Sequence, residues 1–582
     1  DTRGGAILIT LRRRRDGGMD GNLQFSTVQS NRIAGYTPSG RIGIRTGRWT
    51  LTASGSGSFT PVAESRFTET REQAGQPLPF AGRSDSKSRT NYGRGHFSAV
   101  FDPTPKHTAG FDIEYTERST HMPTLSRTTL GQTQSDSRYR QHMDGNTLTA
   151  TANYIWKIDT LGSQFKLIAD YTRYTSDGDN SYHTTTCAPG TLRDSLYESA
   201  TGSVYDILTA DAGLTRKLPH GLTLRAGLRY TRNDMADKSR YAAQTQGTWL
   251  ALPEYSYDQH YTEQIGAAYA SLEYSAGRWE LSAGLRGEYT SVASQAFGRS
   301  YFGLFPNVSV SRALNALRTW LLVAQWSRNI ERPAFPALNP ARIRISDYSW
   351  QSGNPSLRPT YIHRFSLTAV WKYRYTLTVG GNLHHDLIRE IAHRDATAPD
   401  AVYIRPENHY TENHWFVAAS VPAKITRWWN LSVNAVGVMQ RIRLNSTDSP
   451  ATHYLMFADA TCSFTLPAGF FAEAVYRAQS RLYSGNSEVG PRHTLSATVK
   501  KQLFGKRLTL FCTLSNITGC DWEFASLTDG MRRTIDTGQA WSGRLWKVGA
   551  AWNFRTGKKF RARTVESAAE TQRKRLVKST EQ

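Results

Sequence analysis

The stretch LTLRAGLRYTRN, residues 222–233, alternates apolar and polar side chains without a break. Successive side chains of an extended strand point to opposite faces, so a period of two indicates a β-strand. One face would carry Leu222, Leu224, Ala226, Leu228 and Tyr230. The other face would carry Thr223, Arg225, Gly227, Arg229 and Thr231. The fold and the function depend on the environment that each face meets.

The same alternation recurs along most of the chain. It is clear in QFKLIADYTRY (164–174), where only Ile168 breaks the pattern, in WELSAGLRGEYT (279–290) and in RLWKVGAAWNF (544–554). Segments rich in Gly, Pro, Asn, Asp and Ser separate these runs, among them the long polar segment TREQAGQPLPFAGRSDSKSRTNYGRG (70–95). Helical periodicity is nearly absent, and its best candidate is the short stretch VESAAETQRKRLVK (565–578). The sequence therefore predicts an all-β protein with strands of about 10 residues.

Two environments accept strands of this kind. A soluble β-sandwich would bury the apolar face in a core, whereas an outer-membrane barrel would turn it to lipid and turn the polar face to the lumen. Three features favour the barrel. Many Ala and Gly residues on the apolar faces would leave costly cavities in a packed core, short links alternate with long polar ones, and aromatic residues lie near strand ends, where barrels carry interfacial girdles. These aromatic residues are Trp156, Tyr171, Tyr174, Tyr230, Trp279, Tyr289, Trp371, Trp428, Trp429, Trp546 and Trp552.

For a transmembrane antiparallel β-barrel, the length of the chain predicts the number of strands and the domain boundaries. A spanning strand with its share of turn and loop takes roughly 24 residues, so the stretch from Asn22 to Phe554 predicts about 22 strands, a size associated with a plugged lumen. The barrel would occupy residues 16–556, between an N-terminal segment at 1–15 and a polar C-terminal tail at 557–582. The polar strand faces would line the lumen with Arg225, Arg229, Arg286 and Glu288.

The composition argues against several other classes of protein. No stretch approaches the roughly 18 apolar residues of a spanning helix, so a helical membrane protein is excluded. The four cysteines have no CxxC spacing, which gives no sign of a zinc site; Cys512 and Cys520 could pair on one hairpin or remain free thiols. No enzyme motif is present, and we expect neither an enzyme nor a cofactor.

The chain is strongly basic, with a formal net charge of +23. The run Arg12 to Arg15 and the tail would attract phosphate, but no nucleic-acid-binding motif accompanies them, so we expect no nucleic acid partner. The lumen charges would either satisfy a plug or form a ligand site, and external loops would meet the phosphates of lipopolysaccharide.

The triplet His384-His385-Asp386 invites interpretation as a metal site. Because no second group of ligands accompanies it, a polar loop is the favoured interpretation, and we expect no metal.

The segment SRNIERPAFPALNPARIRISDYSWQSGNPSLRPTYIHRFSLT (327–368) is distinctive. Its prolines lack the ladder donor of a strand interior, so it would connect strands. It resembles the signature of the barrels of Bacteroidetes TonB-dependent receptors, and YTEQIGAAYASLEY (261–274), GLFPNVSVS (303–311) and KKQLFGKRLTLFCTLSNITG (500–519) resemble the same family in the same order. The signature would be a structural loop in the lumen or at the rim, or a ligand contact. Its residues are Arg328, Asn329, Arg332, Pro333, Asn339, Pro340, Gly353, Asn354, Pro355 and Pro359.

Both ends of the chain also resemble this family. RGGAILITLRRRR (3–15) is similar to the last strand of the plug domain, which implies that residues 1–15 are the end of a truncated plug. The rest of the plug, the TonB-contacting segment and the signal peptide would then be missing. Phe554 matches the aromatic residue that commonly ends the last strand of bacterial barrels.

The resemblance implies a function at the outer membrane of a Gram-negative bacterium. An intact receptor would bind a small, scarce nutrient and import it with energy from the TonB system, in contact with outer-membrane lipid and lipopolysaccharide. The missing plug favours an alternative, a plugless passive pore or a structural or adhesive surface barrel, or else the product of a truncated gene. A soluble basic β-protein that binds polyanions is a third hypothesis. The sequence does not name the nutrient.

Overall fold

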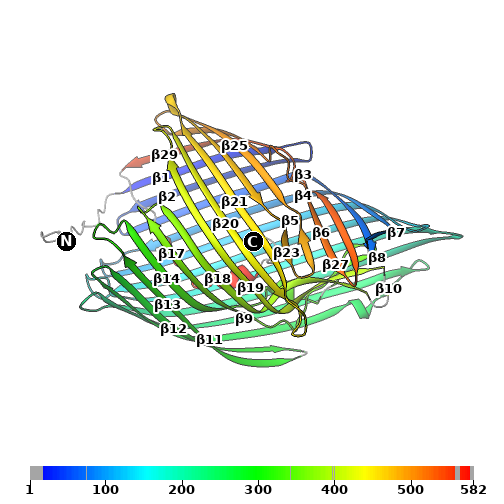
Figure 1. Ribbon diagram of the computed structural model, residues 1–582, viewed down its shortest axis with the longest axis horizontal. Helices are drawn as coiled ribbons and strands as arrows, with labels where there is room; N and C mark the ends of the chain where they lie inside the picture. The colour runs from blue at the N-terminus through cyan, green and yellow to red at the C-terminus, as the bar shows by residue number, and fades with distance from the viewer. Residues whose placement is uncertain are drawn as a thin grey trace.

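The barrel is closed, because its first and last strands pair with each other. In the computed structural model β1 (Gly18–Gln29) runs antiparallel to β29 (Leu545–Gly557), from Gly18 opposite Gly557 to Gln29 opposite Trp546. Figure 1 shows a single ring of tilted strands in which these two lie side by side. The structure describes residues 17–557, except 74, 296, 341, 396–397 and 399, and residues 564–576.

The wall consists of 22 antiparallel strands, which confirms the predicted fold class and strand number. Besides β1 and β29 they are β2 (Ile33–Thr46), β3 (Trp49–Gln73), β4 (Gln76–Phe101), β5 (His107–Leu130), β6 (Thr133–Lys157), β7 (Gln164–Ala188), β8 (Thr191–Lys217), β9 (Leu222–Thr245), β11 (Tyr257–Ala276), β12 (Trp279–Ser294), β13 (Gly298–Ala313), β14 (Trp320–Glu331), β17 (Thr360–Trp371), β18 (Tyr375–Arg394), β19 (Val402–Lys424), β20 (Trp429–Arg443), β21 (Ala451–Thr465), β22 (Phe470–Gln479), β25 (Arg492–Leu503) and β26 (Leu508–Ser515).

The remaining elements are short and belong to the connections or to the C-terminal segment. The strands are β10 (Thr248–Ala251), β15 (Ile343–Ser346), β16 (Ser349–Gln351), β23 (Leu482–Ser484), β24 (Ser487–Val489), β27 (Trp522–Thr528) and β28 (Met531–Gly538). The helices are η1 (Pro253–Tyr255), α1 (Phe335–Leu338), η2 (Pro467–Gly469), α2 (Glu570–Arg573) and η3 (Lys574–Leu576). Helix α2 and η3 lie in the stretch that the sequence indicated as its best helical candidate.

The two ends of the barrel differ in the length of their connections. At one end Gly47 and Arg48 join β2 to β3, and Gly277 and Arg278 join β11 to β12. Gly47 and Gly277 have φ of 55° and 58°, a left-handed conformation that glycine adopts at no steric cost. The opposite end carries the long connections, including residues 332–359 between β14 and β17. Outer-membrane barrels have this asymmetry, with short periplasmic turns and long external loops.

Strand β9 has the two faces that its alternation predicts. Leu228 and Tyr230 point outward, where 64% and 41% of their surfaces are exposed, whereas Thr223 and Thr231 are buried on the inner face. On β7, Ile168 lies on the inner face beside the buried Asp170, so the one misfit in that run is an apolar residue in the lumen wall. The apolar face is therefore the outer face of the barrel.

The expected strand length of about 10 residues is wrong for much of the wall. The polar segment at 70–95 is not a loop but the tip of a hairpin between β3, of 25 residues, and β4, of 26 residues. Beyond the membrane the outer face of a strand no longer meets lipid, so the apolar alternation ends while the backbone hydrogen bonds continue. Periodicity therefore measures the spanning part of a strand and misses its extension.

No helix among the described residues is long and apolar enough to cross a membrane. Cys187, Cys462, Cys512 and Cys520 are all free thiols, so the alternative of a Cys512–Cys520 bridge is not realised. The segment at 1–15, with its basic run at Arg12–Arg15, lies outside the described residues, as do residues 558–563 and 577–582 of the tail.

Candidate functional site

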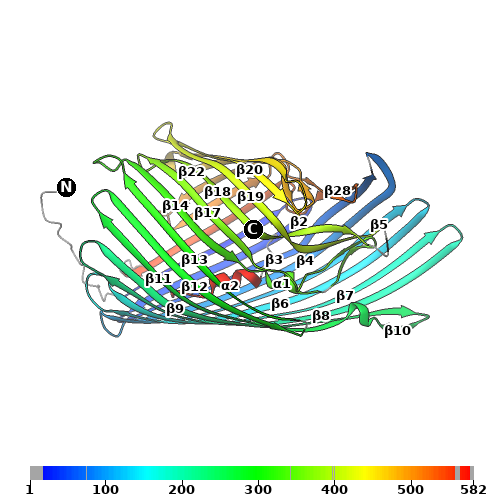
Figure 2. The same ribbon diagram turned by 60° about the horizontal axis from the view of Figure 1, so that its bottom comes forward.

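The connection between β14 and β17, residues 332–359, folds into the mouth of the barrel. We call it the signature loop. It contains α1, β15 and β16, and Figure 2 shows α1 inside the ring of strands. Strand β16 pairs in parallel with the outer end of β19, from Ser349 opposite Val402 to Gln351 opposite Ile404. The loop also contacts β6 and β7 through Asp347, on another part of the wall, so it crosses the mouth of the barrel.

Apolar side chains fix the loop to the inner wall. Phe335, Leu338 and Leu357 of the loop are at most 3% exposed. They form one buried cluster with inward side chains of β8, β9, β11 and β12, namely Tyr205, Ile207, Met235, Tyr261 and Val292. Burying such side chains contributes about 1.5–3 kcal/mol each, so this cluster is a main reason why the loop folds inward.

Polar anchors fix the far side of the loop. The Asp347 carboxylate accepts hydrogen bonds from the hydroxyls of Ser137 and Tyr139 on β6 and of Thr184 on β7, and it pairs with Arg344 at 2.6 Å. Asp347 was not predicted as a site residue. Its only signal in the sequence is an acidic residue in a loop, which does not identify a partner.

The loop also closes on itself through three predicted signature residues, Asn339, Gly353 and Asn354. The Gly353 amide donates to the Asn339 carbonyl at 2.9 Å, and the Asn354 amide donates to the Ala337 carbonyl at 2.7 Å. A Cβ at position 353 would lie 2.1 Å from the Asn339 carbonyl oxygen, so only glycine fits there. The side chain of Asn354 donates to the Pro406 carbonyl at 3.0 Å.

We expect Gly353→Ala to loosen the signature loop, at a cost of about 1–3 kcal/mol, because the new methyl group meets a backbone atom that cannot rotate away. Limited trypsin digestion would detect the change as new cleavage after Arg342 or Arg344. Gly543→Ala is the matched control, because nothing lies within 4 Å of a Cβ at that loop position. Equal trypsin resistance of the two variants would contradict the close packing at Gly353.

A buried ion network joins the loop to the wall. Arg332, from the loop, donates to Glu288 of β12 at 2.7 Å and to the Thr290 hydroxyl at 2.9 Å, and its Nε lies 3.9 Å from Glu263 of β11. Arg286 pairs with the other oxygen of Glu288 at 2.5 Å. The structure thus brings Arg332 of the predicted signature together with Arg286 and Glu288 of the predicted lumen lining.

Two members of this network were missed, Glu263 and Arg575. Glu263 is 2% exposed and accepts hydrogen bonds from Asn233 at 2.8 Å and from Arg575 at 2.5 Å. The strand alternation places Glu263 on the inner face, and that signal could have found it. Nothing local in the sequence places Arg575, which lies in the tail, beside a strand 312 residues earlier.

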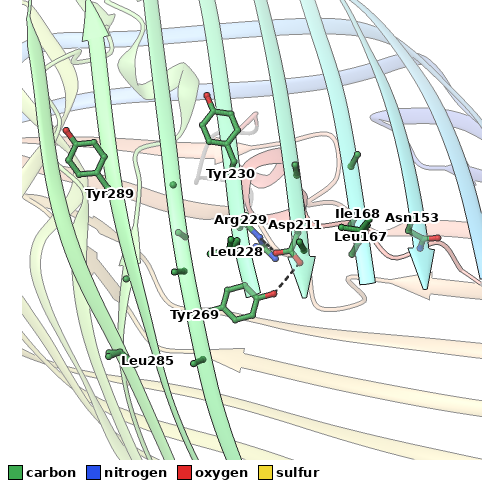
Figure 3. A pocket seen from close by; sticks show the side chains of 18 of the residues that line it. Asn153, Leu167, Ile168, Asp211, Leu228, Arg229, Tyr230, Tyr269, Leu285 and Tyr289 are labelled. Atoms are coloured by element: carbon green, nitrogen blue, oxygen red, sulfur yellow. Dashed lines mark hydrogen bonds and ion pairs between the residues drawn. The ribbon is translucent and has the colours of Figure 1, made fainter. Parts of the chain in front are cut away.

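The two other predicted lumen arginines lie on the inner face and pair with acidic residues of the wall. Arg229 binds Asp211 at 2.8 Å, and the Tyr269 hydroxyl donates to the same carboxylate at 3.3 Å, as Figure 3 shows. Arg225 pairs with Glu273. These pairs lie lower in the barrel than the network at Glu263, nearer the short turns.

The large depression in Figure 3 does not open onto this network. It has a volume of about 1250 Å³ and an almost wholly apolar lining. Small residues that point outward make its floor, among them Ala210, Ala212, Gly266, Ala268 and Ala270, between the larger Leu228 and Tyr289. It lies on the lipid-facing surface, where acyl chains fill gaps that would be cavities in a packed core.

The remaining signature residues lie in the loop or on β14, the strand that precedes it. On β14, Arg328 donates to the Leu304 carbonyl at 3.2 Å and lies over the ring of Tyr361, while Asn329 donates to Ser327 at 2.9 Å. The Pro333 carbonyl accepts a hydrogen bond from Arg575. Pro340 and Pro355 are half-buried in the loop, and Pro359 is buried just before β17.

Phe554, the predicted terminal aromatic residue, lies on the closing strand β29 opposite Gly21 of β1. A Cβ at Gly21 would lie 2.2 Å from the Phe554 ring, so the ring fills the space that the glycine leaves at the seam of the barrel.

The interpretation of the His384 triplet as a loop is wrong, because its residues lie on β18. His384 and His414 have ring centroids 5.0 Å apart, and His414 pairs with Glu412 at 2.8 Å. Asp386 pairs with Arg358 at 2.6 Å. Within the part of the chain that the structure describes, no group of three or more His, Cys, Asp or Glu side chains has a geometry that could hold a metal.

Several solved structures share this fold at low sequence identity. The siderophore receptor PirA from Pseudomonas aeruginosa has a TM-score of 0.55 and 12% identity, over 93% of this chain and 81% of that chain. A mutant of the ferric enterobactin receptor PfeA from the same organism gives 0.58 and 14%, over 92% and 80%. The copper transporter OprC gives 0.60 and 11%, over 93% and 81%.

Comparison of the sequence itself gives the family. No curated protein matches significantly. Residues 156–549 match the model of the outer membrane protein beta-barrel family. Because this match covers more than half of the chain, the chain belongs to the outer membrane protein beta-barrel family, and it is located in the outer membrane of a Gram-negative bacterium.

Proposed function

We propose that this chain is a TonB-dependent receptor that takes up a scarce nutrient across the outer membrane. The observation that carries the proposal is a 22-strand wall whose mouth is crossed by an inward-folded loop. Barrels of this strand number are the size of outer-membrane transporters with a plugged lumen. The resemblance of residues 327–368 to receptors of Bacteroidetes supports the same function and an origin of the chain in that bacterial group.

The ligand would bind at the outer hairpins and the upper lumen, without covalent chemistry. The structurally similar proteins are named for siderophores, ferric enterobactin and copper. Ferric chelates and copper complexes are therefore the first candidates, followed by haem, cobalamin, peptides and glycans. Movement of a plug by the TonB system would open the path to the periplasm.

Charged side chains on the outer surface above the apolar band would bind a second set of partners, the outer-membrane lipids and lipopolysaccharide. On β9 the aromatic Tyr230 is followed on the same outward face by Arg232, Asp234, Lys238 and Arg240. Basic side chains at this height would meet the phosphates of lipopolysaccharide, while Leu228 and its neighbours meet lipid chains.

Uptake in the native bacterium tests the proposed function. A strain that lacks the gene, and the same strain complemented with the full gene, would be given labelled ferric siderophores, copper, haem or cobalamin, each with and without a protonophore. We expect deletion to abolish the protonophore-sensitive uptake of one nutrient and complementation to restore it. Loss only of protonophore-insensitive permeation would instead indicate a passive pore, and loss only of surface attachment would indicate an adhesive barrel.

A further inference from the structure

The segment that follows the last strand returns into the barrel. Residues 564–576, here called the tail segment, contain α2 and η3, and Figure 2 shows α2 inside the ring of strands next to α1. Within it Ala568, Ala569, Gln572 and Arg575 are at most 8% exposed. A tail dissolved in water would not bury these side chains.

The tail segment follows the inner wall upward from the end with the short turns. Lys166 of β7 binds Glu566 at 2.6 Å, and Asp170 of the same strand accepts a hydrogen bond from the Ala568 amide at 2.7 Å. Farther up, Asn233 of β9 donates to the Gln572 side chain at 3.3 Å. These three wall residues all lie on the inner face.

The upper end of the tail segment is held by one guanidinium group. Arg575 binds the Glu263 carboxylate at 2.5 Å and donates to the Pro333 carbonyl at 2.9 Å, and it lies 4.2 Å above the Phe335 ring. Glu263 belongs to the wall, whereas Pro333 and Phe335 belong to the signature loop. Leu576 packs against the apolar cluster that fixes that loop. A carboxylate, a carbonyl and an aromatic face are all groups that bind a guanidinium.

We propose that the tail segment is a latch that holds the signature loop against the inner wall and so narrows the mouth of the barrel, with Arg575 as the ligand of a guanidinium site shared by Glu263 and the signature loop. While Arg575 is bound, the loop is held against the wall and the tail segment occupies the lumen below it. When Arg575 leaves, both parts lose a shared contact, and the site becomes open to a guanidinium or similar cation from solution. This inference concerns the barrel itself and does not rest on energised uptake.

Conductance in planar lipid bilayers tests the latch on the 582-residue chain. We expect Arg575→Ala to show a larger single-channel conductance than the unaltered chain, because release of the signature loop widens the mouth. Lys574→Ala is the matched control, since Lys574 directly precedes Arg575, and its side chain is 63% exposed and pairs with Glu570. Glu263→Gln, changed on the wall side, should raise the conductance as Arg575→Ala does. Heat-modifiable mobility on gels shows whether each variant is folded.

Chemical rescue separates a guanidinium site from general loosening. Added methylguanidinium should lower the conductance of the Arg575→Ala channel by filling the empty site, whereas urea, which is neutral, should leave the conductance unchanged. A decrease with urea as well, or no effect of methylguanidinium, would reject the guanidinium site. If folded Arg575→Ala and Glu263→Gln barrels conduct no more than the unaltered chain, the latch itself is rejected. None of these results depends on which nutrient, if any, the barrel imports.

Discussion

Replacing Glu69 by alanine is expected to lower the free energy of unfolding by about 3–5 kcal/mol, because it leaves two buried charges without a partner. Glu69 of β3 binds Arg71 on its own strand and Arg533 on β28, each at 2.8 Å. The two arginines lie directly opposite each other in the pairing of β3 with β28, and both are at most 4% exposed. Like charges in that position destabilise a sheet unless an acid lies between them.

The same cluster also holds the signature loop, which raises the effect of the substitution. Arg71 donates to the carbonyls of Tyr348 and Asp400, and Arg533 donates to the Ser349 hydroxyl at 3.1 Å. Urea titration of the barrel in lipid vesicles would measure the loss. Glu64→Ala on the same strand is the matched control, because the pair of Glu64 with Lys87 is half-exposed and such pairs contribute about 0–1 kcal/mol. A loss for Glu69→Ala no larger than for Glu64→Ala would contradict this interpretation.

The Glu69 cluster also gives the direction of a pH dependence. Burial alone would raise the pKa of the Glu69 carboxyl, but Arg533 and Arg71 outweigh burial and hold the pKa below its ordinary value of 4.5. A lowered pKa in the folded state means that the carboxylate stabilises the barrel fully above pH 4.5. This stabilisation is lost as the pH falls through the folded-state pKa. In Glu69→Ala the unfolding free energy should therefore depend less on pH below 4.5.

Ala226→Arg is expected to cost about 2–4 kcal/mol, because it places a charge at the middle of the lipid-facing band. Ala226 is the central member of the outward series from Leu222 to Tyr230 on β9. The cost would be measured by unfolding of the barrel in vesicles, since detergent micelles adapt to a charge more easily than a bilayer.

Ala236→Arg is the matched control for this prediction. It makes the same change on the same strand and the same face, ten residues farther along, between the charged Asp234 and Lys238. We expect the control to change stability by less than about 0.5 kcal/mol, as surface substitutions do. Equal costs at the two positions would mean that the outer face of β9 meets one environment along its whole length, which is incompatible with a lipid band that ends near Tyr230.

The strand alternation was sufficient to predict most of the wall. A period of two at Leu222–Asn233 and in similar runs gave the outer apolar face and the inward position of Arg225, Arg229, Arg286 and Glu288, and the length of the patterned stretch gave the strand count. This works because lipid and lumen impose opposite polarity on successive residues of a spanning strand. The alternation could not give the length of the hairpins beyond the membrane, where the outer face of β3 and β4 no longer meets lipid.

The sequence also indicated which connection is unusual, but not its position. The prolines and the Gly353-Asn354 pair mark residues 332–359 as a connection, because a chain without ladder donors cannot continue a sheet. Whether such a loop extends into solvent or folds inward depends on partners far away in the chain. Tyr205, Met235 and Tyr261 provide the apolar wall, and Asp347 reaches two other strands for its hydrogen bonds.

By itself, the sequence determined an antiparallel outer-membrane barrel of about 22 strands, its lipid face and its signature loop. Each of these features follows from the local alternation of side chains or from local backbone chemistry. Only the tertiary structure decided what lies inside the barrel. Arg575 meets Glu263 across 312 residues, and Arg71 meets Arg533 through Glu69, because closing the ring brings distant strands face to face. Such contacts are set by the closed geometry of the sheet, which no local pattern of residues records.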